Sequence, residues 1–142
     1  MKDEFRKHIV IGSKHISIRA AERQLKTILD GLHLADTQEH NILVATSEAL
    51  NNAVAHGNKN DPDKEVSLDV QYRNSSVTIE VLDQGRGFNL SRLPDPLLPE
   101  NLLKPSGRGI HIMKSLMDSV AFDFTPAGTK IILKLKVRKS NK

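Results

Sequence analysis

The chain has 142 residues, which is the size of one domain and too short for two. It contains no cysteine, which excludes disulfide bonds and thiolate metal sites, and its aromatic content of 4% leaves few rings for stacking on nucleic-acid bases. The formal net charge is +4. The N-terminus lacks the apolar core of a signal peptide, and no segment approaches the ~18 apolar residues of a membrane span. We therefore expect a cytoplasmic protein that binds neither membrane nor nucleic acid.

The first half of the chain predicts a strand, two helices and a hairpin. Residues 5–12 have the pattern of a short strand, and residues 14–32 that of a helix, because apolar residues recur near helical spacing. The second helix is predicted over 36–56, with Asp36 or Thr37 as its N-cap and Gly57 as its stop. Apolar and polar residues then alternate in two segments, which predicts an antiparallel hairpin over 66–72 and 77–82.

The second half begins with an irregular segment. Residues 84–107 contain four prolines, which no regular element tolerates in such number. A stretch of this length is more often a functional lid than a passive connector, and we assign the lid to about residues 88–106. One further helix and two strands are predicted after it, over 108–118, 119–124 and 129–137.

The basic character of the chain belongs to its end. Lys130 to Lys142 contains six of the 21 basic residues and no acidic residue. Because no aromatic residue is interleaved, we interpret about residues 138–142 as a solvated basic tail rather than as a nucleic-acid or anionic-membrane patch.

The second predicted helix carries polar side chains beside its apolar face. Glu48, Asn52 and His56 are spaced four residues apart, which places them in a ridge along one edge of that face, while Asn51 points elsewhere and suits surface or partner contact. An amide oxygen suits Mg²⁺ that is bound chiefly by phosphates and water, and a carboxylate one turn away can accept a proton from an attacking hydroxyl. Each residue also has an ordinary explanation: a solvated glutamate, an asparagine satisfied by a nearby loop, and a histidine at the negative end of the helix dipole.

A first glycine pair follows the predicted hairpin. Asp83 lies at the end of a strand, just before Gly85 and Gly87. A carboxylate there can accept a hydrogen bond from an exocyclic amine such as that of adenine, and glycine allows the backbone to approach a ligand closely. A hairpin turn or a bulge would explain the same pattern.

A second glycine pair opens the helix predicted after the lid. Unpaired backbone N–H groups at a helix start, beside Gly107, Arg108 and Gly109, predict an anion site. The alternative is a flexible hinge capped by Ser106, with Lys104 and Arg108 in solvent. Neither pair belongs to a Rossmann fingerprint or a P-loop, because the third glycine is missing and no Gly-Lys-Ser/Thr occurs.

These motifs, together with a glycine and threonine that open the last strand, follow one another in a fixed order. They are Glu48-x-x-x-Asn52, Asp83-x-Gly85-x-Gly87, the proline-rich lid, Gly107-x-Gly109 and Gly128-Thr129. As a set they resemble the GHKL (Bergerat-fold) ATP-binding superfamily of gyrase, histidine kinases and mismatch-repair ATPases. The segments EALNNAVAHGN and SLMD, the latter after the second glycine pair, are most similar to sequences of the bacterial anti-sigma-factor serine/threonine kinases. The resemblance covers about residues 5–137.

The resemblance implies a fold and a role for each site residue. The fold is an α/β (α+β) two-layer sandwich over a single domain, 1–142, with a mixed, mostly antiparallel sheet, helices on one face and ATP between the helices and the lid. The implied roles are a general base for Glu48, Mg²⁺ binding for Asn52, adenine contact for Asp83, shaping of the base pocket for Gly85 and Gly87, wrapping of the phosphates for Gly107 to Gly109, and support of the adenine side for Thr129. His56 and Arg108 are at positions that fit phosphate contact.

The activity implied by the resemblance is that of an ATP-dependent protein serine kinase. Such a protein uses Mg-ATP to phosphorylate a STAS-domain anti-anti-sigma factor, and it also sequesters a sigma factor, as a homodimer. Two alternatives stay open: a related kinase of a signalling complex that binds no sigma factor, and a non-catalytic nucleotide-gated binding module. A detached histidine-kinase domain is disfavoured, since the chain shows no phospho-acceptor helix pair and a phospho-accepting histidine would not need Glu48 as a base.

Overall fold

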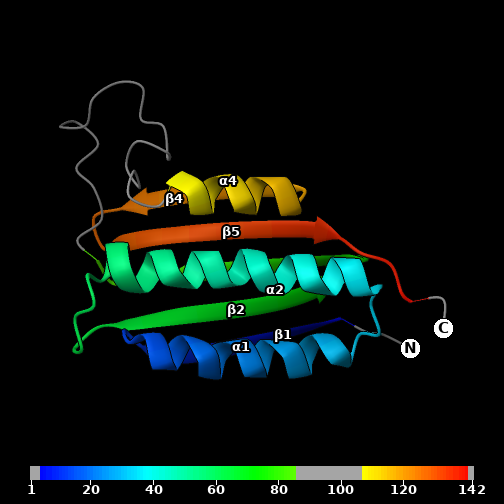
Figure 1. The fold of residues 1–142 in the computed structure, drawn as a ribbon, viewed down its shortest axis with the longest axis horizontal. Coiled ribbons are helices and arrows are strands. Elements are labelled where there is room, and N and C mark those ends of the chain that lie inside the picture. The colour runs from blue at the N-terminus through cyan, green and yellow to red at the C-terminus, as the bar shows by residue number, and fades with distance from the viewer. Residues whose placement is uncertain (1–3, 86–106, 141–142) are drawn as a thin grey trace.

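A computed structural model describes residues 4–85 and 107–140 of the chain. The elements in chain order are β1 (Phe5–Gly12), α1 (His15–Asp30), α2 (Asp36–Asn51), the π-helical turn η1 (Asn52–Gly57), β2 (Glu65–Arg73), β3 (Ser76–Leu82), α4 (Gly107–Leu116), β4 (Ser119–Thr125) and β5 (Gly128–Lys136). The strands form one five-stranded sheet in the order β1-β2-β3-β5-β4, and α1, α2 and α4 lie over one of its faces (Figure 1).

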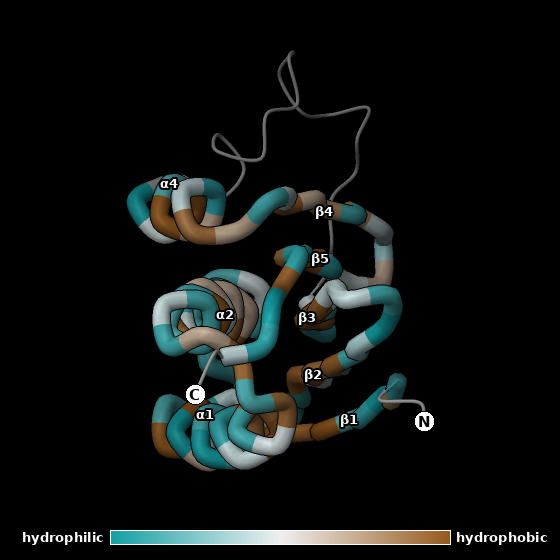
Figure 2. Tube along the Cα trace, turned by 90° about the vertical axis from the view of Figure 1, so that its right-hand side faces the viewer, coloured by the Kyte–Doolittle hydropathy of each residue, from teal (hydrophilic) through white to brown (hydrophobic). Residues whose placement is uncertain are grey.

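The two layers are plain when the molecule is turned by 90°, with the helices on one side and the strands on the other (Figure 2). This arrangement confirms the expected α+β sandwich. The sheet was expected to be mixed and mostly antiparallel, and every pairing between the described strands is antiparallel. The helices in the described ranges do not combine the length and apolar character needed to span a bilayer.

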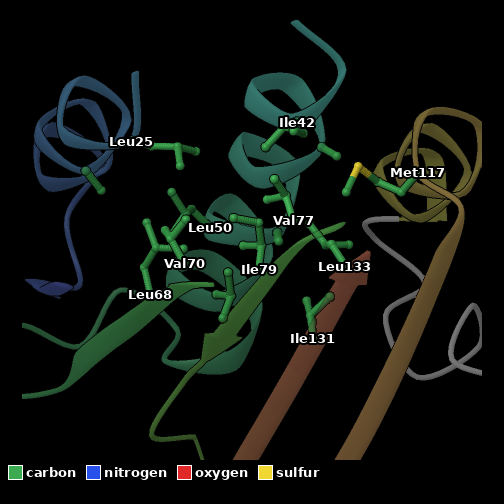
Figure 3. Packing of buried hydrophobic residues seen from close by; sticks show 14 of the residues in the cluster. Leu25, Ile42, Leu50, Leu68, Val70, Val77, Ile79, Met117, Ile131 and Leu133 are labelled. Atoms are coloured by element: carbon green, nitrogen blue, oxygen red, sulfur yellow. The ribbon is translucent and has the colours of Figure 1, made fainter. Parts of the chain in front are cut away.

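The core lies between the helices and the sheet because each central strand alternates buried and less buried residues. Across β2 and β3, Leu68 faces Val81 and Val70 faces Ile79. Leu50 of α2 lies over these strands in the same cluster (Figure 3). Each such fully buried aliphatic side chain contributes roughly 1.5–3 kcal/mol of transfer free energy, so the aliphatic composition is enough to build the core.

The second helix begins at Asp36, so its N-cap position precedes both predicted cap residues. The N-cap position is Ala35, which offers no side-chain hydrogen bond, so neither Asp36 nor Thr37 is the cap. Asp36 lies in the first turn together with Glu39, where acidic side chains are favoured by the positive end of the helix dipole.

The same helix changes its hydrogen-bonding pattern before it ends at Gly57. The Asn58 N–H donates to the Ala53 carbonyl at 2.8 Å, a five-residue step that defines the π turn η1. A π turn contains more residues than an α turn, and such turns are frequent at functional sites. The continuous helix predicted over 36–56 is therefore an α-helix followed by one wider turn.

The C-terminal residues pair with the connection between α1 and α2 as far as Ser140. The Ala35 N–H donates to the Arg138 carbonyl at 3.2 Å, and the Ser140 N–H donates to the His33 carbonyl at 2.7 Å. The backbone of residues 138–140 is therefore attached to the fold, while the side chains of Arg138 and Lys139 are exposed. Charge alone could not reveal this, because the pairing uses backbone groups.

Candidate functional site

A polar pocket of about 420 Å³ lies between the second helix and the start of α4. Three elements supply its lining residues: Glu48, Asn51, Asn52, Ala55 and His56 come from α2 and η1, and Arg108, Gly109 and Ile112 come from α4. The pocket therefore brings together residues that two separate sequence motifs predicted, from points more than 50 residues apart in the chain.

The carboxylate of Glu48 lies against the first turn of α4. A β-carbon on Gly109 would be 2.7 Å from Glu48 Oε1, so the carboxylate occupies space that any other residue type at 109 would fill. The helix begins at Gly107, and the partial positive charge of a helix N-terminus favours a carboxylate there. Glu48 is thus held beside the backbone N–H groups that could receive an anion.

Asn52 is the buried polar group of this pocket. Only 4% of it is exposed, and its Nδ2 makes no hydrogen bond with any described residue. A buried donor without a partner costs about 1–3 kcal/mol, so a ligand that offers an acceptor here would be favoured. The amide also provides an oxygen that could coordinate a hard cation.

Asn51 lines the same pocket, which the sequence did not anticipate. Its Nδ2 donates to the Ser47 carbonyl at 2.8 Å, one turn back along the helix. Residues three and four apart are neighbours on a helix surface, so Asn51 and Asn52 flank Glu48 on its two sides. The prediction that Asn51 points away from Glu48 and Asn52 is therefore wrong, because a residue three positions along a helix also lies beside the first.

Asp83 forms a second, buried group of contacts at the end of β3. Its Oδ1 accepts hydrogen bonds from the Thr129 N–H at 3.0 Å and the Gly85 N–H at 2.9 Å. Burial raises the pKa of the Asp83 carboxyl, and these two backbone donors partly oppose that change. The carboxylate also lies directly over Gly57, where a β-carbon would collide with Oδ2.

Gly57 connects the two groups of residues. It follows His56, which lines the pocket, and it contacts Asp83, which does not. The sequence predicted Gly57 only as a helix stop, although its lack of a side chain is what allows Asp83 to approach the helix. Gly87 and the lid assigned to about 88–106 lie outside the described residues.

A larger pocket of about 680 Å³ lies between α1 and α2. It contains none of the sequence-predicted site residues, and its lining is Arg19, Glu22, Arg23, Lys26, Thr27, Leu43, Val44 and Ser47. Its carboxylate, Glu22, accepts a hydrogen bond from the Ser47 hydroxyl. Among the described residues, no side chain that lines this pocket has a buried polar atom without a hydrogen bond. We therefore assign the candidate chemistry to the smaller pocket.

The chain is similar to known proteins in sequence. Residues 12–135 match the family described as the histidine kinase-like ATPase domain. The anti-sigma F factor of Clostridium perfringens is 34% identical over 131 residues, which cover 89% of this chain and 87% of that protein. The anti-sigma F factor of Clostridium beijerinckii is 29% identical over 124 residues, which cover 85% of this chain and 82% of that protein.

A solved structure is similar in fold. It contains the RsbU and RsbW domains of Rv1364c from Mycobacterium tuberculosis, and it matches 96% of this chain and 33% of that chain with a TM-score of 0.72. The sequence identity is 19%, so this likeness concerns the arrangement of the helices and the sheet alone.

Proposed function

Because the chain belongs to the histidine kinase-like ATPase domain family, we propose that it is an ATP-dependent protein serine/threonine kinase that also acts as an anti-sigma factor. The observation that carries the proposal is the single pocket shared by Glu48, Asn52 and the first turn of α4. A carboxylate, a buried amide and a helix N-terminus are groups suited to an attacking hydroxyl, a metal ion and a phosphate. The relatives named anti-sigma F factor support the sigma-binding part.

The nucleotide would lie along the second helix. Asp83, supported by the N–H of Thr129 and flanked by Gly85, would accept a hydrogen bond from the adenine amine. The N–H groups from Gly107 onward, with Arg108 beside them, would bind the phosphates. His56 on the pocket wall would add a phosphate contact.

The pocket fits a magnesium ion that arrives with the nucleotide. The described residues contain no cluster of three or more His, Cys, Asp or Glu side chains suited to a metal, so a site made by the protein alone is not available in them. Mg²⁺ is commonly held by one or two protein oxygens together with substrate phosphates and water, and the buried Asn52 amide offers one such oxygen. When bound there, the ion would neutralise phosphate charge.

Glu48 would act as the general base. Its carboxylate accepts the proton of a serine hydroxyl on a STAS-domain anti-anti-sigma factor while that oxygen bonds to the γ-phosphorus and the bond to the ADP leaving group breaks. The N–H groups of the α4 first turn stabilise the charge on the transferred phosphoryl group, because they are fixed in place before the reaction.

Sigma-factor binding would be a separate surface interaction of a cytoplasmic homodimer. Two narrower functions fit the same pocket: a kinase of a signalling complex that binds no sigma factor, and a binding module that responds to ATP without transferring phosphate. Co-purification of a sigma factor separates the first from the proposed function, and phosphoryl transfer separates the second.

The deciding experiment combines γ-labelled ATP with a STAS-domain protein. We expect label on a serine of that protein, and we expect Glu48→Gln to bind ATP while transferring less than about 1% of the label, because a general base contributes roughly 10²–10⁴-fold. Glu39→Gln is the matched control, since Glu39 lies on the same helix but bonds to Lys26 away from the pocket. Unimpaired transfer by Glu48→Gln would reject the assigned base.

A further inference from the structure

A buried asparagine closes the helix that carries the candidate site. Asn58 follows Gly57, caps η1 and is 1% exposed. Its Nδ2 donates to Ser13 Oγ at 2.7 Å and to the Glu65 carbonyl at 2.9 Å, while its Oδ1 accepts from the Gln84 N–H at 2.7 Å. One side-chain amide therefore joins the segment after β1, the end of η1, the start of β2 and the segment after β3.

The partners fix the orientation of this amide. The Gln84 N–H can only donate and the Glu65 carbonyl can only accept, so the Asn58 oxygen faces the former and the NH₂ group faces the latter. Ser13 Oγ donates its own hydrogen to the Lys64 carbonyl at 2.8 Å, which leaves it as an acceptor for Asn58. A buried network whose donors are all used is rigid and specific.

Gln84 lies in the chain between Asp83 and Gly85, which are joined by a hydrogen bond. Its N–H belongs to the peptide plane that starts at Asp83, so a hydrogen bond to that N–H fixes the orientation of this plane. On the other side, the Gly85 N–H donates to Asp83 Oδ1 at 2.9 Å. The Gln84 side chain adds a further constraint, because its Oε1 accepts from the Glu65 N–H at 2.7 Å.

From these contacts we propose that Asn58 is a positioning residue for base recognition. Through the Gln84 N–H it sets the direction in which the Asp83 carboxylate meets the exocyclic amine of an adenine nucleotide. Asn58 does not itself contact the base. The assignment rests on the proposed function, because it requires that adenine binds at Asp83, and its signature is a change in selectivity between bases rather than in stability alone.

The test compares the dissociation constants of ATP and inosine triphosphate, which lacks the exocyclic amine. Asn58→Ala removes the bond to Gln84. Ser13→Ala removes two other bonds of the same network, those of the Ser13 hydroxyl with Asn58 and with the Lys64 carbonyl, and leaves the Asn58–Gln84 bond in place. Both variants should be less stable than the unaltered chain. Only Asn58→Ala should lower the preference for ATP, by roughly five- to tenfold, which is the factor that corresponds to one hydrogen bond.

Two results would overturn the proposal in different ways. If Asn58→Ala keeps the full preference for ATP while losing stability as Ser13→Ala does, Asn58 is a structural residue only. If the unaltered chain binds ATP and inosine triphosphate equally, the adenine site at Asp83 is rejected, and the positioning role is rejected with it.

A measurement on the unaltered chain covers the case in which Asn58→Ala does not fold. Hydrogen exchange at the Gln84 amide should be slower with ATP bound than with inosine triphosphate bound, because the bond from the base to Asp83 is transmitted to the adjoining peptide. Equal exchange with the two nucleotides would contradict the proposal.

Discussion

The carboxylate of Glu48 fills the space that a side chain on Gly109 would need: Glu48 Oε1 is 2.7 Å from the point where a β-carbon of residue 109 would be. The contact joins α2 to the first turn of α4, and both residues line the polar pocket. Gly109 therefore has a role besides leaving room for phosphate, since it determines where the carboxylate can rest. The two motifs that the sequence presents separately are one structural unit.

Replacement of Gly109 by alanine should separate activity from stability. The methyl group would displace the end of the flexible Glu48 side chain, while alanine in place of glycine favours a helix by about 0.5–1 kcal/mol. We expect phosphoryl transfer to fall roughly 10- to 100-fold, because small misplacements of a catalytic group have effects of this size. Thermal unfolding should occur at an equal or higher temperature.

A double mutant isolates the cause of that loss. If Gly109→Ala acts by displacing Glu48, it should have little further effect on the residual transfer of Glu48→Gln. A second full loss of activity in the double mutant would show that the methyl group acts on phosphate binding instead.

Replacement of Gly57 by alanine should affect both folding and nucleotide affinity. A β-carbon there would collide with the carboxylate of Asp83 and lie 2.9 Å from the Asp83 β-carbon, which a rotation of the side chain end cannot relieve. We expect a loss of about 1–3 kcal/mol in the free energy of unfolding, as for other overpacked sites, with weaker ATP binding.

Gly31→Ala is the matched control for this prediction. A β-carbon at Gly31 would meet only the Ile28 carbonyl at 3.4 Å, and Gly31 has the helical φ of −66°. Urea unfolding of both variants should therefore show a loss for Gly57→Ala alone. Equal stabilities would mean that Asp83 moves away from the helix at no cost.

The sequence was sufficient for features that depend on one element at a time. Glu48 and Asn52 share an edge because the rotation of 100° per residue applies along α2 and up to Asn52, its C-cap residue, which keeps a helical backbone conformation. The alternation of apolar and polar residues likewise identified the strands, since it shows which face of a strand is buried. It does not show which strand lies beside which, so the order β1-β2-β3-β5-β4 could not be obtained from it.

Features that depend on distant segments were missed. The π turn begins at Asn52 and is followed by the buried cap residue Asn58, whose partners lie on Ser13, Glu65 and Gln84. No local pattern reports such contacts. The contact between Gly57 and Asp83 was missed for the same reason, because it becomes visible only when β3 is packed beside the helix end.

Removal of the Lys139 side chain should weaken the attachment of the C-terminal residues. Its Nζ donates to the Leu32 carbonyl at 2.7 Å and lies 5.2 Å from the centre of the Tyr72 ring. We expect Lys139→Ala to lower the free energy of unfolding by about 1 kcal/mol, since one hydrogen bond and one exposed cation–π contact are lost. Lys134→Ala, at an exposed position of β5, should change it by less than about 0.5 kcal/mol, and equal losses would contradict the attachment.

The buried carboxyl of Asp83 should make the stability of the protein fall as pH rises. Burial raises its pKa in the folded chain above the usual value of 3.8. At a pH between 3.8 and the pKa of the folded chain, the folded state therefore binds more protons than the unfolded state. Stability linked to this group is then fully present below pH 3.8 and is lost as pH rises through the folded pKa.

Asp83→Asn should remove this dependence while it keeps an oxygen that can accept the N–H groups of Thr129 and Gly85. Urea unfolding of both proteins from about pH 4 to pH 7 should show the variant gaining stability relative to the unaltered chain as pH rises, because the variant has no charge to bury. At neutral pH the variant should also bind ATP more weakly, since a neutral amide is a poorer acceptor for the adenine amine than a carboxylate. Parallel stability curves would show that Asp83 is not the group that titrates.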